Sequence, residues 1–400
     1  MRVTSSYFQR FAIDQMQRAQ KNIAKYQAHI STGKKLLNPS DDPSAVATTE
    51  KLDAAIQRME QYKSNANAVR QRLSQQEDVF NNLTDTMQRL KELSIQANTD
   101  VLSDEDRKII ASEVRQLQKQ LLDYANTRLP GGDYMFAGSM GKTRPFGMVG
   151  DEVVYYGDQS ESWVQLSDSR KVRANDTGDV IFQRIRNGNG KFYTDAAASN
   201  TGTGTIDGGV LADPAQFKRH NYEIRFTAAD TYKVVDLSDS GNEVASGSYQ
   251  PGAPIDFDGI SVSISGEPKA NDVFTVAPSK NVDIFSIAAD FANALELDRN
   301  VESNVAKAHQ TFDNVINNID RTLEHVQARH SDLGARMAYV DTTEEETASV
   351  AFILNKTRSE IEDTDYAEAI SNLDAQMTAL EAIRRTYAKM GQSSLFDYLR

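Results

Sequence analysis

Residues 52–97 of this chain read LDAAIQRMEQYKSNANAVRQRLSQQEDVFNNLTDTMQRLKELSIQA. Apolar or small side chains recur through this stretch at spacings of three and four, which is the period of a coiled-coil seam. The pattern predicts one helix over residues 44–98, which at 1.5 Å per residue is about 80 Å long. Only Gln76 and Ser94 interrupt the seam with polar side chains. The seam positions are Leu52, Ala55, Met59, Tyr62, Ala66, Val69, Leu73, Phe80, Leu83, Met87, Leu90 and Ala97.

A second series with the same period lies near the other end of the chain, from Val305 to Val340. A narrow seam of this kind needs partner helices. A shorter helix is expected from Ser103, because the three acidic residues that follow it would favour the positive end of a helix dipole. These patterns predict an α+β fold, in which both chain ends build a long antiparallel coiled-coil rod and a mainly β domain is inserted in the centre.

Each terminal arm is separated from the rod by a break. Residues 38–43 read NPSDDP, in which the prolines disfavour helix in the residues before them and the Ser/Asp cluster can cap the next helix. The second break lies near Glu362–Asp365. Alone, such arms bury too little to be stable, so we expect them to pair with each other and with neighbouring copies. The residues expected to make these contacts are Phe8, Phe11, Met16, Ile23, Ile30, Ile370, Leu373, Met377, Leu380, Tyr387, Leu395 and Phe396.

The middle of the chain has a different composition. Between Pro145 and Asp283 lie 15 of the 22 glycines, and 20 Asp and Glu stand against 12 Lys and Arg. The acidic excess is typical of a solvated surface. Residues 194–209 are of low complexity and are expected to form a mobile loop. Short strands are expected at residues 153–156, 163–166, 180–182, 222–226, 232–235, 262–264 and 273–276.

Composition excludes several classes of function. The chain has no cysteine, which rules out disulfides and cysteine-based metal sites or nucleophiles. The formal charge of −13 argues against a nucleic-acid partner, and no apolar run approaches the length of a membrane span. The start of the chain lacks the basic and apolar regions of a classical cleaved signal. No constellation predicts an enzyme, a cofactor or a metal site, and the five histidines are expected at seam or surface positions.

Three segments carry a family resemblance. Residues 31–43, STGKKLLNPSDDP, resemble the break after the first helix of bacterial flagellins and flagellar hook-associated proteins, and residues 358–367, RSEIEDTDYA, resemble their C-terminal signature. Residues 134–138, YMFAG, and 391–396, GQSSLF, are closer to the hook-associated protein 3 branch than to filament flagellins. Residues 222–278 resemble a β module inserted in several flagellar axial proteins.

The resemblance implies a structural role in the bacterial flagellum. It implies an extracellular adaptor layer between the hook, with its hook-associated protein 1, and the flagellin filament. It also implies export through the flagellar type III system without a cleaved signal, a chaperone on the C-terminal helix, and a helical layer of identical subunits. Filament flagellin itself is the alternative.

The same resemblance predicts three layers. Residues 1–43 with 365–400 would be inner-core helices, residues 44–144 with 284–364 a helical rod, and residues 145–283 a β-rich outer insert. Where the insert begins between residues 133 and 185 is left open by the sequence.

Overall fold

The computed structural model describes residues 2–99, 102–150 and 152–392, and side chains between Tyr7 and Lys389. The chain divides into two compact units. Met1–Ser64 and Thr343–Arg400 form the first, called the terminal unit below. Asn65–Thr342 form the second, called the central unit. Both boundaries fall inside long helices.

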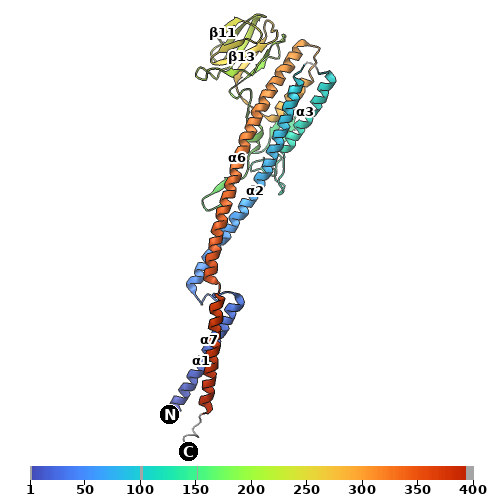
Figure 1. Ribbon diagram of the computed structural model, residues 1–400. Helices are drawn as coiled ribbons and strands as arrows, with labels where there is room; N and C mark the ends of the chain where they lie inside the picture. Colours follow the sequence, from blue (N-terminus) through green and yellow to red (C-terminus); the bar gives the residue numbers. More distant parts are fainter. Residues whose placement is uncertain (1, 100–101, 151, 393–400) are drawn as a thin grey trace, which may run out of the picture. The chain divides into compact units, whose positions relative to one another are not determined.

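The helices follow the sequence pattern closely. The N-terminal arm and residues 44–98 are predicted to be helical, and helices occupy Arg2–Thr32 and Pro43–Ala97. The third helix begins where predicted, because Ser103 and Asp106 form a reciprocal capping box. The described helices are α1 (Arg2–Thr32), α2 (Pro43–Ala97), α3 (Asp104–Ala125), α4 (Gly178–Phe182), α5 (Ile284–Leu295), α6 (Glu302–Glu362) and α7 (Tyr366–Gln392), shown in Figure 1.

Within the central unit, α2 and α6 are antiparallel. Asn98 donates to Asp313 at 2.9 Å, while farther toward the start of α2 the Arg70 guanidinium lies 2.6 Å from Asp341. Residue numbers therefore increase along α2 in the direction in which they decrease along α6. The α+β prediction, with helices from both chain ends around a β insert, is confirmed.

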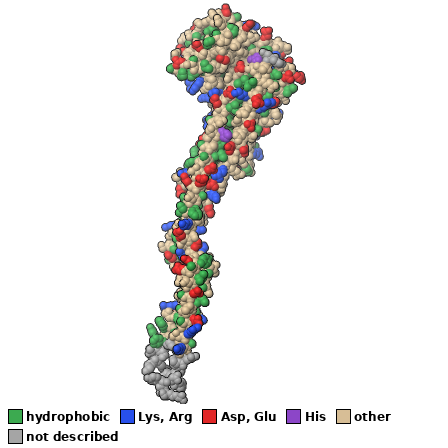
Figure 2. All heavy atoms as spheres, in the orientation of Figure 1, with side chains coloured by type: hydrophobic (Ala, Val, Ile, Leu, Met, Phe, Trp, Pro, Cys, Tyr) green, Lys and Arg blue, Asp and Glu red, His purple; other side chains and the backbone are tan. Residues whose placement is uncertain are grey.

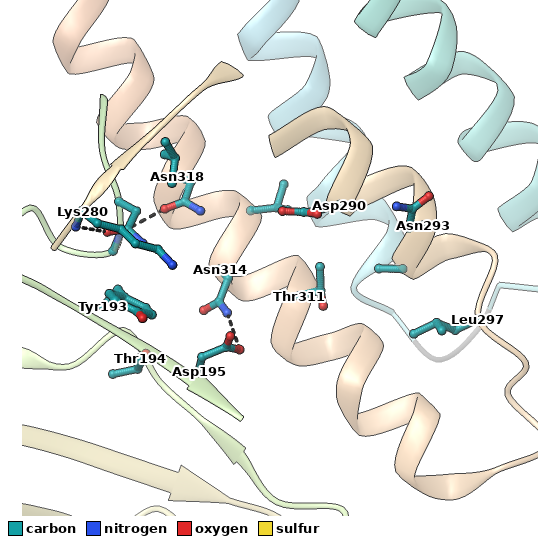
Figure 3. A pocket seen from close by; sticks show the side chains of 15 residues that line it. Tyr193, Thr194, Asp195, Lys280, Asp290, Asn293, Leu297, Thr311, Asn314 and Asn318 are labelled. Atoms are coloured by element: carbon teal, nitrogen blue, oxygen red, sulfur yellow. Dashed lines mark hydrogen bonds between the residues drawn. The ribbon is translucent and has the colours of Figure 1, made fainter. Parts of the chain in front are cut away.

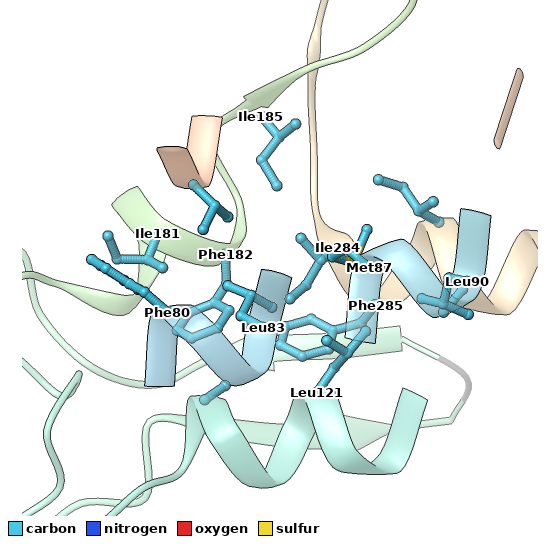
Figure 4. Close-up of a cluster of buried hydrophobic side chains, with 14 of the residues drawn as sticks. Phe80, Leu83, Met87, Leu90, Leu121, Ile181, Phe182, Ile185, Ile284 and Phe285 are labelled. Carbon is cyan, nitrogen blue, oxygen red and sulfur yellow. The ribbon is translucent and has the colours of Figure 1, made fainter. Parts of the chain in front are cut away.

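The seams of these helices form one hydrophobic core with α3 and α5 (Figure 4). The predicted seam residues from Ala66 to Ala97 are buried. Both polar interruptions are buried as well, and each has a partner: the Gln76 amide donates to Asp176, and the Ser94 hydroxyl donates to the Lys91 carbonyl at 2.8 Å. A buried polar group without such a bond would be costly.

The strands are short and all their pairings are antiparallel. The strands are β1 (Phe146–Val149), β2 (Glu152–Tyr155), β3 (Trp163–Gln165), β4 (Lys171–Arg173), β5 (Ile185–Arg186), β6 (Phe192–Ala196), β7 (Thr205–Ile206), β8 (Val210–Leu211), β9 (Tyr222–Ala228), β10 (Thr231–Asp236), β11 (Asn242–Ser248), β12 (Pro254–Phe257), β13 (Ile260–Ser265), β14 (Val273–Pro278) and β15 (Asn281–Val282).

Two sheets make a β module with a core of its own. One has the strand order β11-β10-β9-β14-β6, and the other has the order β12-β13-β7, with β8 also on β13. Their buried side chains, between Phe192 and Val276, form a cluster separate from the helical core. By contrast, buried residues between Phe146 and Ile185 belong to the helical core. The β module with its own core therefore begins after residue 186, while the preceding hairpins pack with the helices.

Two local expectations were wrong. Residues 180–182 are not a strand but lie in α4, because a short apolar run does not distinguish a buried strand from a buried helical turn. Residues 194–209 are not a mobile loop. The buried Asp272 carboxylate accepts from the N–H groups of Thr201 and Gly202 at 2.8 and 3.0 Å, and the Asn200 side chain pairs with both backbone groups of Val273.

The β module is attached to α6 through amide side chains. Gln310 is 2% exposed; its Oε1 accepts from the Ile206 N–H at 2.8 Å and its Nε2 donates to the Ile206 carbonyl at 2.9 Å. The side chain thus pairs with β7 as a neighbouring strand would. Farther along α6, Asn318 accepts from the Gly188 N–H at 3.0 Å.

Candidate assembly interface

The break after α1 and the break before α7 lie beside each other in the terminal unit. Lys34 and Asp363 form an antiparallel β-bridge. The Lys35 N–H donates to the Glu362 carbonyl at 2.8 Å, and the Thr364 N–H donates to the Gly33 carbonyl at 2.8 Å. Two breaks from opposite ends of the chain therefore form one structure, called the joint below (residues 33–43 and 362–365).

Aspartates of the joint end one helix and begin the next. Asp42 Oδ1 accepts from the N–H groups of Ser44 and Ala45, both at 3.0 Å, and so caps α2. Asp365 caps α7 in the same way. Asp41 accepts from the Asn38 N–H at 2.9 Å, and this bond is the main reason that the pKa of the Asp41 carboxyl lies below its ordinary value. The sequence NPSDDP thus specifies a rigid turn.

Charged side chains cross the joint. Lys34 pairs with Glu362, and the Lys35 ammonium donates to the Glu360 carbonyl at 2.9 Å. These groups are partly exposed, so the Lys34–Glu362 ion pair contributes only about 0–1 kcal/mol. Their main effect is to fix which residues of the first break lie beside which residues of the second.

Beyond the joint, α1 and α7 pack against each other, and in Figure 1 they lie side by side. Among their described side chains, only Ala19, His29, Ala369 and Leu380 are buried. Two helices of 31 and 27 residues therefore share a very small core. Isolated helices gain most of their stability from packing, so this pair is weakly stabilised by itself.

The predicted contact residues divide into two sets. Met16, Ile23, Ile30, Leu373 and Leu380 are half-buried or buried, whereas five others are exposed. The exposed set comprises Phe8, Phe11, Ile370, Met377 and Tyr387, with exposed fractions from 37% to 53%. Leu395 and Phe396 lie outside the described residues.

Sequence reasoning missed part of the apolar surface. On α6, within the terminal unit, Phe352 is 70% exposed and Ile353 is 58% exposed, and Tyr7 and Ile13 are exposed on α1. Figure 2 shows hydrophobic side chains at the surface of this part of the chain. Phe352 and Ile353 lie beyond Val340, the last residue of the predicted seam. Two large apolar residues outside the seam could have indicated this exposed surface. Exposed apolar side chains are typical of interaction surfaces, so we expect neighbouring subunits to cover them.

A polar groove lies between β6, α5 and α6 of the central unit (Figure 3). Its volume is about 460 Å³, and Asn314 donates to Asp195 across it at 3.3 Å. Burial is the main reason that the pKa values of Asp195 and Asp290 lie above the ordinary range. Asn314 and Asn318 of α6 both bond to residues of the β module side, Asp195 and Gly188, so we interpret the groove as part of the attachment of the β module.

Metal-ligating and membrane-spanning features can be judged for the described part of the chain. There, no three His, Cys, Asp or Glu side chains gather in a way that could hold a metal ion. Over the same residues, no helix combines the length and apolar character needed to cross a membrane.

Comparisons with known families account for both chain ends and for the β module. Residues 5–140 match the bacterial flagellin N-terminal helical region, and residues 316–399 match the bacterial flagellin C-terminal helical region. Residues 195–278 match the D2-like domain of flagellar hook-associated protein 1. This last match coincides with the separate core of the β module.

A crystal structure of flagellar hook-associated protein-3 from Legionella pneumophila is 33% identical, with a TM-score of 0.74, over 78% of this chain and 98% of that chain. The chain belongs to the flagellar hook-associated protein 3 family. This membership confirms the resemblance found in the sequence and places the protein among components of the bacterial flagellum.

Two curated relatives of this chain match it less completely or at lower identity. Flagellar hook-associated protein 3 of Escherichia coli (strain K12) is 34% identical over 183 residues, which are 46% of this chain and 57% of that protein. The chain thus spans a little over half the length of this curated relative. Polar flagellin C of Vibrio parahaemolyticus is 25% identical over 89% of this chain and 86% of that protein.

Proposed function

We propose that this protein is a structural adaptor layer between the flagellar hook and the flagellin filament. Its place in the hook-associated protein 3 family carries the proposal. The terminal unit supports it, because α1 and α7 leave aromatic and aliphatic side chains exposed over most of their length. A subunit of a larger array would cover such side chains with its neighbours.

The partners follow from that position. The layer would contact copies of itself, hook-associated protein 1 on the hook side and flagellin on the filament side. In the assembled tube, residues 1–43 and 365–400 would lie innermost, residues 44–144 and 284–364 would form the rod, and residues 145–283 would face outward. The protein would leave the cell through the flagellar type III system without a cleaved signal, with a chaperone masking the C-terminal helix.

Localisation tests the junction role directly. Antibodies against the β module, followed by electron microscopy of isolated flagella, should label one narrow band where hook and filament meet. A strain lacking the protein should retain hooks and release unassembled flagellin into the medium. Labelling along the whole filament would instead establish the second candidate, filament flagellin, which the long alignment with polar flagellin C favours. Absence of label from flagella would contradict both roles.

A further inference from the structure

A basic groove lies on the central unit where the β module joins α6. Its volume is about 390 Å³, and its walls include Arg184, Arg186, Lys191 and Arg321. Glu324 is the one carboxylate among the residues that the structure describes around it, and His325 is the remaining titratable group. Four permanent cations stand against one carboxylate there, in a chain whose formal charge is −13.

The cations of this groove are not all neutralised within the chain. Arg184 pairs with Asp179 at 2.6 Å, and Arg321 pairs with Glu324 at 2.7 Å. The Arg186 guanidinium donates to the Ser279 carbonyl at 2.9 Å, which leaves its charge unpaired. The exposed Lys191 ammonium has no carboxylate partner in the part of the chain that the structure describes.

The complementary charge lies on the β module. Residues 192–278 contain 12 Asp and Glu and 5 Lys and Arg, so −7 of the net −13 lies in this module. Glu243 and Glu267 are exposed and have no ion pair among the described residues. No described carboxylate of residues 192–278 pairs with a cation of the groove in the same chain. Exposed carboxylates of the β module and the cations of the basic groove therefore both remain available to another molecule.

We infer that the basic groove receives exposed carboxylates of the β module of a second copy. The inference rests on the proposed function, since a layer of identical subunits repeats the contact from each copy to the next. A head-to-tail contact of this kind uses two different surfaces, and both are covered between each copy and the next. Opposite charges would also fix the register of neighbouring copies.

Carbodiimide coupling can detect this contact, because it joins an amine to a carboxylate only when the two are in contact. Isolated flagella treated at low salt should yield peptides that join Lys191 to carboxylates within residues 195–272. Dilute purified protein, treated identically, should yield none of them, which identifies the link as one between copies. Flagella that contain the protein but give no such peptide would overturn the inference while leaving the proposed function intact. Flagella without the protein would overturn both.

Charge reversal provides the second test. Arg186→Glu leaves Lys191 reactive but weakens the positive charge of the groove, and we expect about a two- to fivefold loss of the coupled peptide, in line with exposed ion pairs. Lys171→Glu is the matched control, because Lys171 is exposed and lies outside the groove. Circular dichroism should show that both variants fold like the native protein. Under that condition, equal yields of the coupled peptide from the two variants would contradict the contact.

Discussion

At the scale of single residues, a buried cluster of charged and polar groups joins the central hairpins to the rod. Asp176 accepts from Gln76 of α2 and pairs with Arg336 of α6, and Arg173 lies 3.0 Å from the same carboxylate. The Asp176 side chain is 3% exposed. One carboxylate thus satisfies groups from three parts of the chain.

Asp176→Ala should destabilise the central unit by about 3 kcal/mol, because it removes the one buried carboxylate of the cluster and leaves Arg336 and Arg173 with only the more exposed Asp332 and Glu161. Urea unfolding followed by circular dichroism measures this loss. Glu161→Ala is the control, since Glu161 pairs with the same Arg173 at 3.0 Å but is 45% exposed, and it should cost less than about 1 kcal/mol. Equal costs for the two variants would show that burial of the cluster is unimportant.

His325 makes stability depend on pH. Burial is the main reason that the pKa of its imidazole is lowered in the folded state, with the neighbouring Arg329 acting in the same direction. The neutral ring donates from Nε2 to the Val180 carbonyl at 2.8 Å. The unfolded chain therefore binds this proton more readily, and stability falls as the pH drops below the ordinary histidine pKa of 6.5.

His325→Gln should reduce this pH dependence, because glutamine keeps a donor but does not titrate. Thermal melting at pH 7.5 and pH 5.5 would show a smaller loss of Tm on acidification for the variant than for the native protein. The other titrating groups are common to both chains, so the difference isolates His325. Identical losses would exclude this residue as a contributor.

At the scale of elements, the joint depends on one glycine. Gly33 has φ +73°, and a Cβ there would lie 3.0 Å from the Tyr366 hydroxyl oxygen. A side chain in this left-handed region costs about 1–2 kcal/mol. The β-bridge and the caps of α2 and α7 all lie within a few residues of this position.

Gly33→Ala should therefore lower the amount of the protein found in isolated flagella about fivefold or more, by quantitative blotting against secreted protein. Gly131→Ala should have no effect, because no atom lies within 4 Å of a Cβ at that site. Normal incorporation of the Gly33 variant would mean that the joint tolerates other conformations during assembly.

The terminal helix α7 makes a sharper test of the interface. Leu373 is half-buried on α7, and Leu373→Asp places a charge on an apolar surface that neighbours are expected to cover. We expect loss of incorporation into flagella and loss of swimming, with an intact near-ultraviolet signal from the β module. Ser371→Asp, at an exposed position of the same helix, is the control. Swimming by the Leu373 variant would count against the proposed interface.

At the scale of the whole molecule, the two units differ in how much they bury. The central unit contains both hydrophobic clusters, and no residue of α1 or α7 belongs to either of them. The terminal helices have only four buried side chains among those described. Stability should therefore be unequal along the chain.

In the free monomer, residues before about 45 and after about 365 should exchange their amide protons rapidly and be cleaved first by proteases. The β module and the central helices should be protected, because their hydrogen bonds lie in closed cores. Hydrogen exchange with mass spectrometry measures both regions in one experiment. Strong protection of both termini in the monomer would contradict the idea that assembly stabilises them.

Much of this architecture was predictable because it depends on local pattern. The 3-4 period places the buried face of α2 from Ala66 onward, and prolines and aspartates end and begin helices through contacts within four residues. The predicted contact residues on α1 and α7 lie on the described helices, but their role in assembly remains a prediction.

What the sequence by itself determined is where α1, α2 and α3 begin and end, which face of the long helices is apolar, and that the centre is β-rich and acidic. Only the tertiary structure decided which breaks meet at the joint, that residues 180–182 form a helix, and that residues 194–209 are ordered. The reason is distance along the chain. Periods and caps are set by neighbours, whereas Gln76 and Asp272 find partners up to 100 residues away, and those partners depend on how the folded chain packs.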